Sequence, residues 1–336
     1  MSDDRLIQEE VVEEGVNLRP ENFCDYIGQG RVKERIMLYM QAAKARNQSV
    51  DHILLGGSAG LGKSSIARII AKSMNSNYKY ISAPSIKSKK EFCMFLAALR
   101  DKDVLFIDEI HRLSNVFCEL LFPILEDHKL EVRVEDEYGY VRDVSITLNN
   151  FTVIGATTIA GSLSTMMRDR FPIRETLEFY SPEDLKEIII INAKKLEVDI
   201  TEDGAMEIAK RSRNTPRVCI RLLKRVRDIV QINENNTIDL ESAKKSLQYM
   251  EIDEMGLDKI DISILNLLIE RNKPMGIRVL SANIAEEPST IENEYQPFLL
   301  RKKLIEINPK GVKATDLAYS HLKVERKVDL ESAKIL

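Results

Sequence analysis

The sequence lacks the usual markers of secreted, membrane-spanning and metal-binding proteins. It has only four cysteines, far apart and without CxxC spacing, which argues against a disulfide or zinc framework. No run of apolar residues approaches the roughly 18 to 20 that a transmembrane helix needs. The acidic first 15 residues lack the apolar core of a signal peptide. The net charge is only −4, so contact with nucleic acid would need local patches. We expect a soluble cytoplasmic protein.

The composition itself is that of an ordinary globular protein. Hydrophobic residues make up 44% of the 336 residues and charged residues 30%, so a sizeable core can be buried. The first two-thirds alternates apolar runs with helical patterns, and runs that are apolar without a break are typical of parallel strands covered on both faces. The predicted strands are 51–56, 78–82, 103–108, 151–156 and 175–179, and helices are predicted at 63–74 and 89–100. This alternation predicts a doubly wound α/β domain.

A β-hairpin is predicted inside this domain. Apolar and polar residues alternate with period two between Lys129 and Thr147, around Tyr138-Gly139. After residue 181 the pattern becomes helical, at 182–195, 203–212 and 217–232. Ser181 and Thr215 stand at N-cap positions, each followed by proline. This predicts a small helical domain.

The character changes again near residues 253–256. An amphipathic helix is predicted at 260–270, a capping box at Ser289–Glu292, and two short strands at 304–315 around Pro309-Lys310-Gly311. Helices followed by a small β-wing predict a winged-helix domain. The predicted division is an acidic tail (1–15), an α/β domain (16–180), a helical domain (181–253), a winged-helix domain (254–322) and a charged tail (323–336).

The segment Gly57–Ser64 fits the phosphate-binding pattern GxxxxGK[ST] between an apolar strand and a helix. Gly60 and Gly62 allow backbone N–H groups to turn toward phosphates, and the helix N-terminus adds positive potential. Lys63 is placed to reach the β- and γ-phosphates, and the Ser64 hydroxyl to ligate Mg²⁺. The alternative is a glycine turn that merely begins a helix. The pattern predicts binding of ATP and Mg²⁺.

An acidic pair, Asp108-Glu109, ends the next buried strand. A carboxylate at the carboxyl edge of a parallel sheet, beside the phosphate-binding loop, is placed to hold Mg²⁺. The following carboxylate can orient and polarise an attacking water. The alternative interpretation is a helix N-cap pair.

Polar and cationic residues follow the predicted strand at 151–156. The Thr157 hydroxyl is a candidate sensor of the γ-phosphate, or only a satisfied threonine at a strand end. Arg168 and Arg170 stand on a short helix, and either could neutralise charge in the transition state. Arg217 begins a helix, where a cation is unfavourable to the helix dipole. It is either a functional arginine or a surface arginine.

These motifs, in this order, resemble the RuvB family of AAA+ ATPases over residues 18–322. The motifs that carry the resemblance are LRPENFCDYIGQ (18–29), GLGKSS (60–65), LFIDEIHRLS (105–114), FTVIGATT (151–158), RDRF (168–171), LEFYSPEDL (177–185) and NTPRVCIRLLKRVRD (214–228). The resemblance implies an AAA+ domain, a helical lid and a winged helix. It implies a hexameric ring that hydrolyses ATP and drives Holliday-junction branch migration on duplex DNA with RuvA and RuvC.

The resemblance also implies roles for individual residues. It places Leu18, Arg19, Tyr26 and Ile27 near the adenine, and Gly60, Gly62, Lys63, Ser64 and Ser65 in the phosphate-binding loop. It makes Asp108 and Glu109 the Walker B pair, Thr157 sensor 1, Arg217 sensor 2, Tyr180 a nucleotide contact, and Glu126, Asp127 and His128 a nucleotide-proximal stretch. Arg170 would reach the ATP of a neighbouring subunit, and the hairpin at 129–147 would dock RuvA.

Some positions depart from the family pattern. Ser58-Ala59 replaces two prolines, and Ser64-Ser65 replaces threonines. Serine keeps the Mg²⁺-binding hydroxyl, so we expect hydrolysis to survive. Ile159 replaces an arginine and removes a cation near the nucleotide or the subunit interface.

The wing departs more sharply. Ile307 and Val312 stand where the family has its DNA-contacting arginines. From residue 257 onward the chain has 13 Lys and Arg against 12 Asp and Glu, and each lost phosphate contact weakens binding. Our hypothesis is that DNA contact persists, more weakly, through Lys310 and Lys313. The basic run 301–303 is either part of that patch or a solvated helix end.

Two other functions compete with the DNA motor. One is a different AAA+ role, such as a clamp or helicase loader, with the same fold and nucleotide site. The other is a nucleotide-gated scaffold with little turnover. Intact Glu109 and Arg170 favour the motor.

Overall fold

The computed structural model describes residues 16–135, 140–233 and 236–325. They form two compact units. Unit 1 comprises the chain up to Asp199 together with Asn214–Arg221, and unit 2 comprises Ile200–Arg213 and the chain from Leu222 onward. The predicted N-terminal tail, the hairpin tip at Tyr138-Gly139 and residues 326–336 of the second tail lie outside the described residues.

Unit 1 is built on a five-stranded parallel sheet in the order β2-β3-β6-β1-β7. The strands are β1 (Ile53–Gly56), β2 (Tyr78–Ser82), β3 (Val104–Asp108), β6 (Thr152–Thr157) and β7 (Ile173–Thr176). The central strands β1 and β6 are buried along their whole length, as the unbroken apolar runs predict. The predicted α/β fold of this part of the chain is therefore confirmed.

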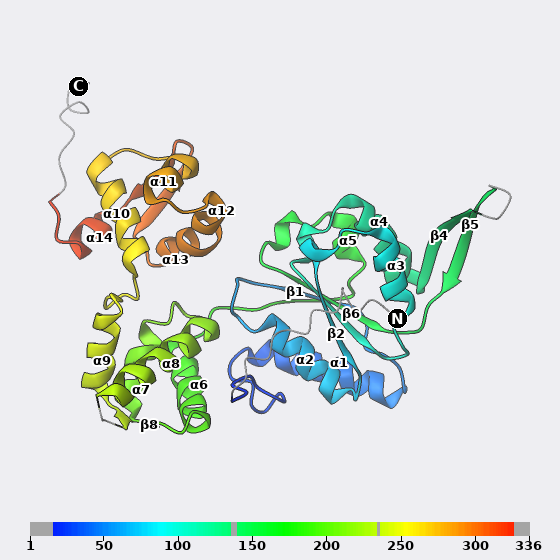
Figure 1. Ribbon diagram of the computed structural model, residues 1–336, viewed down its shortest axis with the longest axis horizontal. Helices are drawn as coiled ribbons and strands as arrows, with labels where there is room; N and C mark the ends of the chain where they lie inside the picture. Colours follow the sequence, from blue (N-terminus) through cyan, green and yellow to red (C-terminus); the bar gives the residue numbers. More distant parts are fainter. Residues whose placement is uncertain (1–15, 136–139, 234–235, 326–336) are drawn as a thin grey trace. The chain divides into compact units, whose positions relative to one another are not determined.

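Helices cover both faces of this sheet (Figure 1). They are α1 (Gly30–Ala45), α2 (Lys63–Ser73), α3 (Lys89–Ala97), α4 (Asn115–Asp127) and α5 (Thr165–Asp169). One apolar cluster joins α3, α4 and α5 to one face of the sheet, with Phe92, Leu121 and Met167 among its buried members. On the other side, α2 buries Ile66, Ile69 and Ile70.

One strand of unit 1 differs from the sequence-based expectation. The last strand was predicted at 175–179 but lies at Ile173–Thr176, where residues alternate between buried and exposed. That alternation is typical of an edge strand and was missed because the prediction favoured unbroken apolar runs. The predicted hairpin is present as β4 (Lys129–Glu135) and β5 (Val141–Thr147).

The predicted helical segment is present as four helices. They are α6 (Pro182–Lys195), α7 (Glu202–Lys210), α8 (Pro216–Ile232) and α9 (Leu240–Tyr249). The Ser181 hydroxyl accepts a hydrogen bond from the Asp184 amide at 3.0 Å, which confirms its role as the N-cap of α6. None of the helices in the described part of the chain has the length and apolar character needed to cross a membrane.

Unit 2 ends in the predicted winged helix. Its elements are α10 (Lys259–Arg271), α11 (Ile277–Ile284), α12 (Pro288–Thr290), the π-helical turn η4 (Ile291–Tyr295), α13 (Gln296–Arg301), β10 (Ile305–Asn308), β11 (Gly311–Ala314) and α14 (Asp316–His321). The capping box predicted at Ser289–Glu292 is wrong. The segment begins at Pro288 with Glu287 as N-cap, because proline suits the first helical position.

A buried cation joins the first helices of unit 2 to its winged helix. The Arg213 guanidinium donates to the carboxylates of Asp258 and Asp261 and lies over the ring of Phe298, 4.7 Å from its centroid. Burial raises the pKa of Asp261 to about 7, against the opposing charge of Arg213. The Arg301 guanidinium donates to the Arg213 carbonyl. Arg301 therefore has a structural contact inside unit 2.

We expect Arg213→Ala to destabilise unit 2. The substitution leaves the Asp261 side chain, which is 0% exposed, without its cation, and breaking a buried ion pair costs about 3–5 kcal/mol. Hydrogen–deuterium exchange of peptides from α10 and α13 in the full chain measures the change. The control is Lys210→Ala, at an exposed position on α7, which should stay within about 0.5 kcal/mol of the unsubstituted protein. Unchanged exchange in Arg213→Ala would contradict this account.

Candidate nucleotide-binding site

The site lies at the carboxyl edge of the unit 1 sheet. Strand β6 pairs with β1 on one side and with β3 on the other, and Gly56 lies directly beside Thr157. Because all these strands are parallel, the loop after Gly56, the end of β3 at Asp108 and the end of β6 at Thr157 meet at one edge. This is the edge at which open α/β sheets bind ligands.

The loop after β1 has the backbone that phosphate binding requires. Gly57, Gly60 and Gly62 have φ angles of 130°, 79° and 100°, which side-chain-bearing residues rarely adopt. Gly62 is also the N-cap of α2, and a Cβ there would lie 2.5 Å from the Tyr26 hydroxyl oxygen. The sequence prediction of a phosphate-binding loop therefore agrees with the local geometry.

Lys63 begins α2 and is held inside this loop. Its side-chain nitrogen donates to the carbonyls of Gly57 at 2.6 Å and Ser58 at 3.0 Å. Burial lowers the pKa of Lys63, while the nearby carboxylates of Glu109 and Asp108 oppose that shift. A buried cation at a helix N-terminus provides a positive potential suited to phosphate groups. Ser64 and Ser65 follow it in the first turn of α2.

Two tyrosine hydroxyls bind the backbone of the loop. The hydroxyls of Tyr26 and Tyr180 lie 3.1 Å apart, and both donate to the carbonyl of Leu61. Burial raises the pKa of Tyr180 to about 12 and that of Tyr26 well above its ordinary value. The structure thus places both predicted tyrosines against the loop, where their hydroxyls stay protonated at neutral pH.

The acidic pair follows β3. Burial raises the pKa of Asp108, and the neighbouring Glu109 carboxylate raises it further. Glu109 has a left-handed backbone, with φ 51° and ψ 43°, and its side chain makes no capping hydrogen bond. Its Oε2 instead accepts from the Thr158 hydroxyl at 3.1 Å. The N-cap alternative therefore has no support from the contacts of Glu109.

His111 lies at the same edge of the sheet, although no sequence pattern predicted it there. This residue lies on the short helical turn η2 (Ile110–Arg112), and its Nδ1 lies 3.0 Å from the Thr157 hydroxyl and 3.2 Å from Glu109 Oε2. The Thr157 hydroxyl also accepts from the Ile159 amide at 3.1 Å. The histidine stands within the motif LFIDEIHRLS, but no periodicity or spacing showed that it would turn back toward Thr157.

The remaining residues predicted around the loop lie in unit 1 as well. The backbone amide of Arg217 donates to the Gly60 carbonyl at 3.4 Å. The positive charge of Arg217 acts to lower the pKa of both Lys63 and Asp108. Leu18 is buried, and the carbonyl of Arg19 accepts from Lys195. Ile27 is partly buried, next to Tyr26. Arg217 is thus an exposed residue whose backbone touches the loop.

A second group of predicted residues lies at the opposite edge of the sheet. The His128 ring packs 5.5 Å from that of His52, which directly precedes β1. Arg170 precedes β7, whose first residue bonds to the His52 carbonyl, and its guanidinium contacts Glu126 at 3.0 Å. Asp127 lies beside Lys129. Since β1 has four residues, about 10 Å of strand separates this edge from the phosphate-binding loop.

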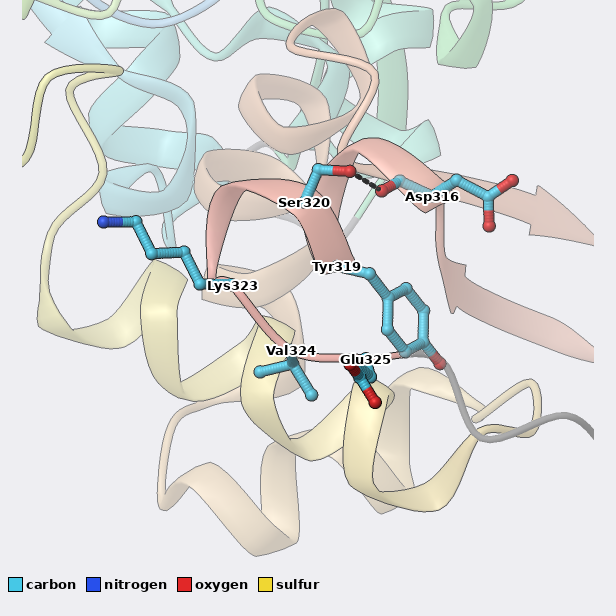
Figure 2. Close-up of a pocket in the computed structure, with 6 residues that line it drawn as sticks. All are labelled: Asp316, Tyr319, Ser320, Lys323, Val324 and Glu325. Carbon is cyan, nitrogen blue, oxygen red and sulfur yellow. Dashed lines mark hydrogen bonds between the residues drawn. The ribbon is translucent and has the colours of Figure 1, made fainter.

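One surface pocket on unit 2 holds none of the predicted site residues. Figure 2 shows its lining by Asp316, Tyr319, Ser320, Lys323, Val324 and Glu325. The Ser320 hydroxyl donates to the Asp316 carbonyl within the same helix. The Tyr319 hydroxyl donates to Asn272 Oδ1 at 3.0 Å. The charges of the pocket are mixed, and it adds nothing to the nucleotide site.

Three family models match consecutive parts of the chain. They are described as the Holliday junction DNA helicase RuvB P-loop domain (residues 18–177), the RuvB AAA lid domain (180–253) and the RuvB C-terminal winged helix domain (254–323). Together they span the fold from the first residues of unit 1 to the end of the winged helix.

Similar proteins point the same way. The chain is 44% identical, over 325 residues, to the Holliday junction branch migration complex subunit RuvB of Staphylococcus saprophyticus, covering 95% of this chain and 97% of that one. The corresponding subunit of Staphylococcus aureus strain Newman is 44% identical over 320 residues, with 95% and 96% covered. The solved Thermotoga maritima RuvB branch migration motor matches with a TM-score of 0.83 and 39% identity, covering 92% and 99%.

We expect Gly62→Ala to weaken nucleotide binding about 5- to 30-fold, since left-handed backbone costs a side-chain-bearing residue roughly 1–2 kcal/mol. The added Cβ would also press on the Tyr26 hydroxyl. Equilibrium titration with a fluorescent ATP analogue measures the affinity. Gly30→Ala is the matched control, because a Cβ there meets no atom within 4 Å. Equal affinities for the two variants would show that the loop conformation does not govern binding.

Proposed function

The chain belongs to the RuvB family, and on that premise we propose that it drives branch migration of Holliday junctions by hydrolysing ATP. It is a P-loop ATPase of the AAA+ type. The observation that carries the proposal is the meeting of Lys63, Asp108 and Thr157 at one edge of the sheet, with Glu109 beside them. Those groups supply a cation, two carboxylates and a hydroxyl, which phosphoryl transfer to water requires.

The chain's own residues divide the work of hydrolysis. Lys63 binds the β- and γ-phosphates, and Glu109 orients the attacking water and takes its proton. Mg²⁺, when bound, neutralises phosphate charge. Its ligands would be Ser64 and Asp108. Burial and the Glu109 carboxylate raise the pKa of Asp108, and a cation beside Asp108 would stabilise its charged form. Among the described residues no group of three or more His, Cys, Asp or Glu could hold a metal, so the phosphates would complete the coordination.

Arg170 acts on the ATP of a neighbouring subunit. Arg170 and Glu126 meet at the edge of the sheet opposite the loop that holds Lys63. A guanidinium at that edge reaches a γ-phosphate only if another copy presents its own loop there. This arrangement supports a closed ring, a hexamer by family resemblance, whose sites each use two subunits. Glu126, Asp127 and His128 would border the same shared site.

The winged helix and the hairpin provide the contacts to DNA and partners. Lys310 is exposed at the tip of the wing, and Lys313 lies directly across the strand pair from Glu306. Val312 is buried, and its backbone pairs with that of Met275. Ile307 is 54% exposed. The wing therefore offers DNA one exposed lysine and one partly buried lysine beside an acid. The hairpin β4–β5 would dock RuvA, and RuvC would join the assembly.

The first test of this function is the ATPase rate with and without duplex DNA and purified RuvA partner, over a salt series. We expect stimulation by DNA that fades as salt rises. Glu109→Gln should lower steady-state phosphate release about a hundredfold or more while ATP binding persists, with the exposed Glu119→Gln on α4 as control. Turnover that ignores DNA and partner would remove branch migration as the direct function. A scaffold would turn over little ATP and lose little with Glu109→Gln.

The wing lysines give a separate prediction. Lys310→Ala combined with Lys313→Ala should weaken DNA binding and reduce the slope of log K against log salt by about 1 to 2, because each lost phosphate contact accounts for about 0.9. Fluorescence anisotropy of labelled duplex measures both quantities. Lys259→Ala, exposed at the start of α10, is the control for loss of a charge. An unchanged affinity and slope would place the DNA contact elsewhere.

A further inference from the structure

His111 occupies a central position between the two polar groups that end β3 and β6. Its side chain is 13% exposed. One nitrogen, Nδ1, lies within hydrogen-bonding distance of both the Thr157 hydroxyl, at 3.0 Å, and Glu109 Oε2, at 3.2 Å. No role proposed above uses this side chain, although it touches the sensor threonine and the water-activating carboxylate at once.

The neighbouring carboxylate indicates which tautomer of His111 suits this position. A carboxylate only accepts hydrogen bonds, so an unprotonated Nδ1 would direct its lone pair at the Glu109 oxygen. The contact with Glu109 is favourable only when Nδ1 carries a hydrogen. A hydrogen on Nδ1 then lies near both the Thr157 hydroxyl oxygen, 3.0 Å from the nitrogen, and Glu109 Oε2, 3.2 Å from it.

The donors around Thr157 indicate whether its hydroxyl donates or accepts its remaining hydrogen bond. Its oxygen has two lone pairs and one hydrogen. The Ile159 amide donates to it at 3.1 Å, and His111 Nδ1–H supplies the second donor. With both lone pairs engaged, Thr157 can form its remaining bond only as a donor, which is the bond that a γ-phosphate oxygen accepts.

Glu109 is restrained from two sides. The oxygen that faces His111 also accepts from the Thr158 hydroxyl at 3.1 Å. Thr157 and Thr158 are neighbours at the end of β6, so a shift of that strand end moves Thr158 directly and acts on His111 through its bond to Thr157. His111 and Thr158 together link the position of Glu109 to the strand end that faces the nucleotide.

We propose that His111 is a positioning residue that keeps the Thr157 hydroxyl a hydrogen-bond donor and couples it to the orientation of Glu109. This inference rests on the proposed function, in which Thr157 contacts the γ-phosphate and Glu109 activates water. When Thr157 donates to that phosphate, its oxygen accepts more strongly from His111 Nδ1–H. The contact between His111 and Glu109 then weakens, and the Glu109 carboxylate turns toward the water. His111 thus links nucleotide sensing to hydrolysis without touching the nucleotide.

The consequence is a separation of binding from turnover. His111→Ala leaves Lys63 and the glycine loop in place, so the KM for ATP should stay within about threefold. Loss of a group that orients a ligating or reacting side chain lowers activity about 10- to 100-fold, so kcat should fall in that range. His111→Asn keeps an N–H close to the position of Nδ1 and should recover a large part of kcat.

The experiment is a double-substitution cycle on the full chain, with kcat and KM for ATP and thermal melting of every variant. His111→Ala is measured alone, with Thr157→Val and with Thr152→Val. Thr152 is the matched control, because it is a buried threonine on the same strand whose hydroxyl bonds to the Val50 carbonyl at the opposite edge. If His111 acts through Thr157, its substitution costs little kcat beside Thr157→Val and its full amount beside Thr152→Val.

Three results would overturn the inference. They are an unchanged kcat in His111→Ala, equal losses in the two threonine backgrounds, and no recovery in His111→Asn at an unchanged melting temperature. Failure of the proposed function would be recognised separately, because the unsubstituted protein would then hydrolyse no ATP or ignore DNA and partner.

Discussion

The site depends on β6 lying between β1 and β3 in a parallel sheet. Strands adjacent in sequence often pair directly, but here β3 and β6 separate β1 from β2, and β6 comes about 45 residues after β3. Insertion of β6 places its last residue, Thr157, between the phosphate-binding loop and Asp108. The backbone pairing therefore sets the order of cation, hydroxyl and carboxylate along one edge before any side chain is placed.

Much of this arrangement could be predicted from the sequence because its signals are local. The loop Gly57–Ser64 has a fixed pattern, and the buried strands read as unbroken apolar runs. The winged helix was predicted from helices followed by the short strand pair around Lys310. The boundaries of elements were predicted less well. The edge strand β7 was misplaced because its residues alternate between buried and exposed instead of forming an unbroken apolar run. The helix start was misplaced because Pro288 takes the first helical position ahead of the expected capping box.

What the sequence did not reveal depends on tertiary contacts. Nothing local shows that the chain turns back after Glu109 so that His111 reaches Thr157, 46 positions away. Likewise, the separation of Arg170 from Lys63 follows from strand direction, which no motif spacing encodes. The two interpretations of the basic run 301–303 differ in the partners of its side chains, and Arg301 donates to the Arg213 carbonyl. In each case the deciding partner is remote in sequence.

The backbone at Glu109 explains how two neighbouring carboxylates can serve the same edge. In an extended strand successive side chains point to opposite faces, so a continued β3 would separate Asp108 from Glu109. The left-handed conformation of Glu109 ends that alternation at once. It costs roughly 1–2 kcal/mol in a residue with a side chain, and burial of Ile110, at 0% exposure, offsets that cost. The same turn brings His111 back over β6, so one strained residue places the water-activating carboxylate and the histidine that holds it.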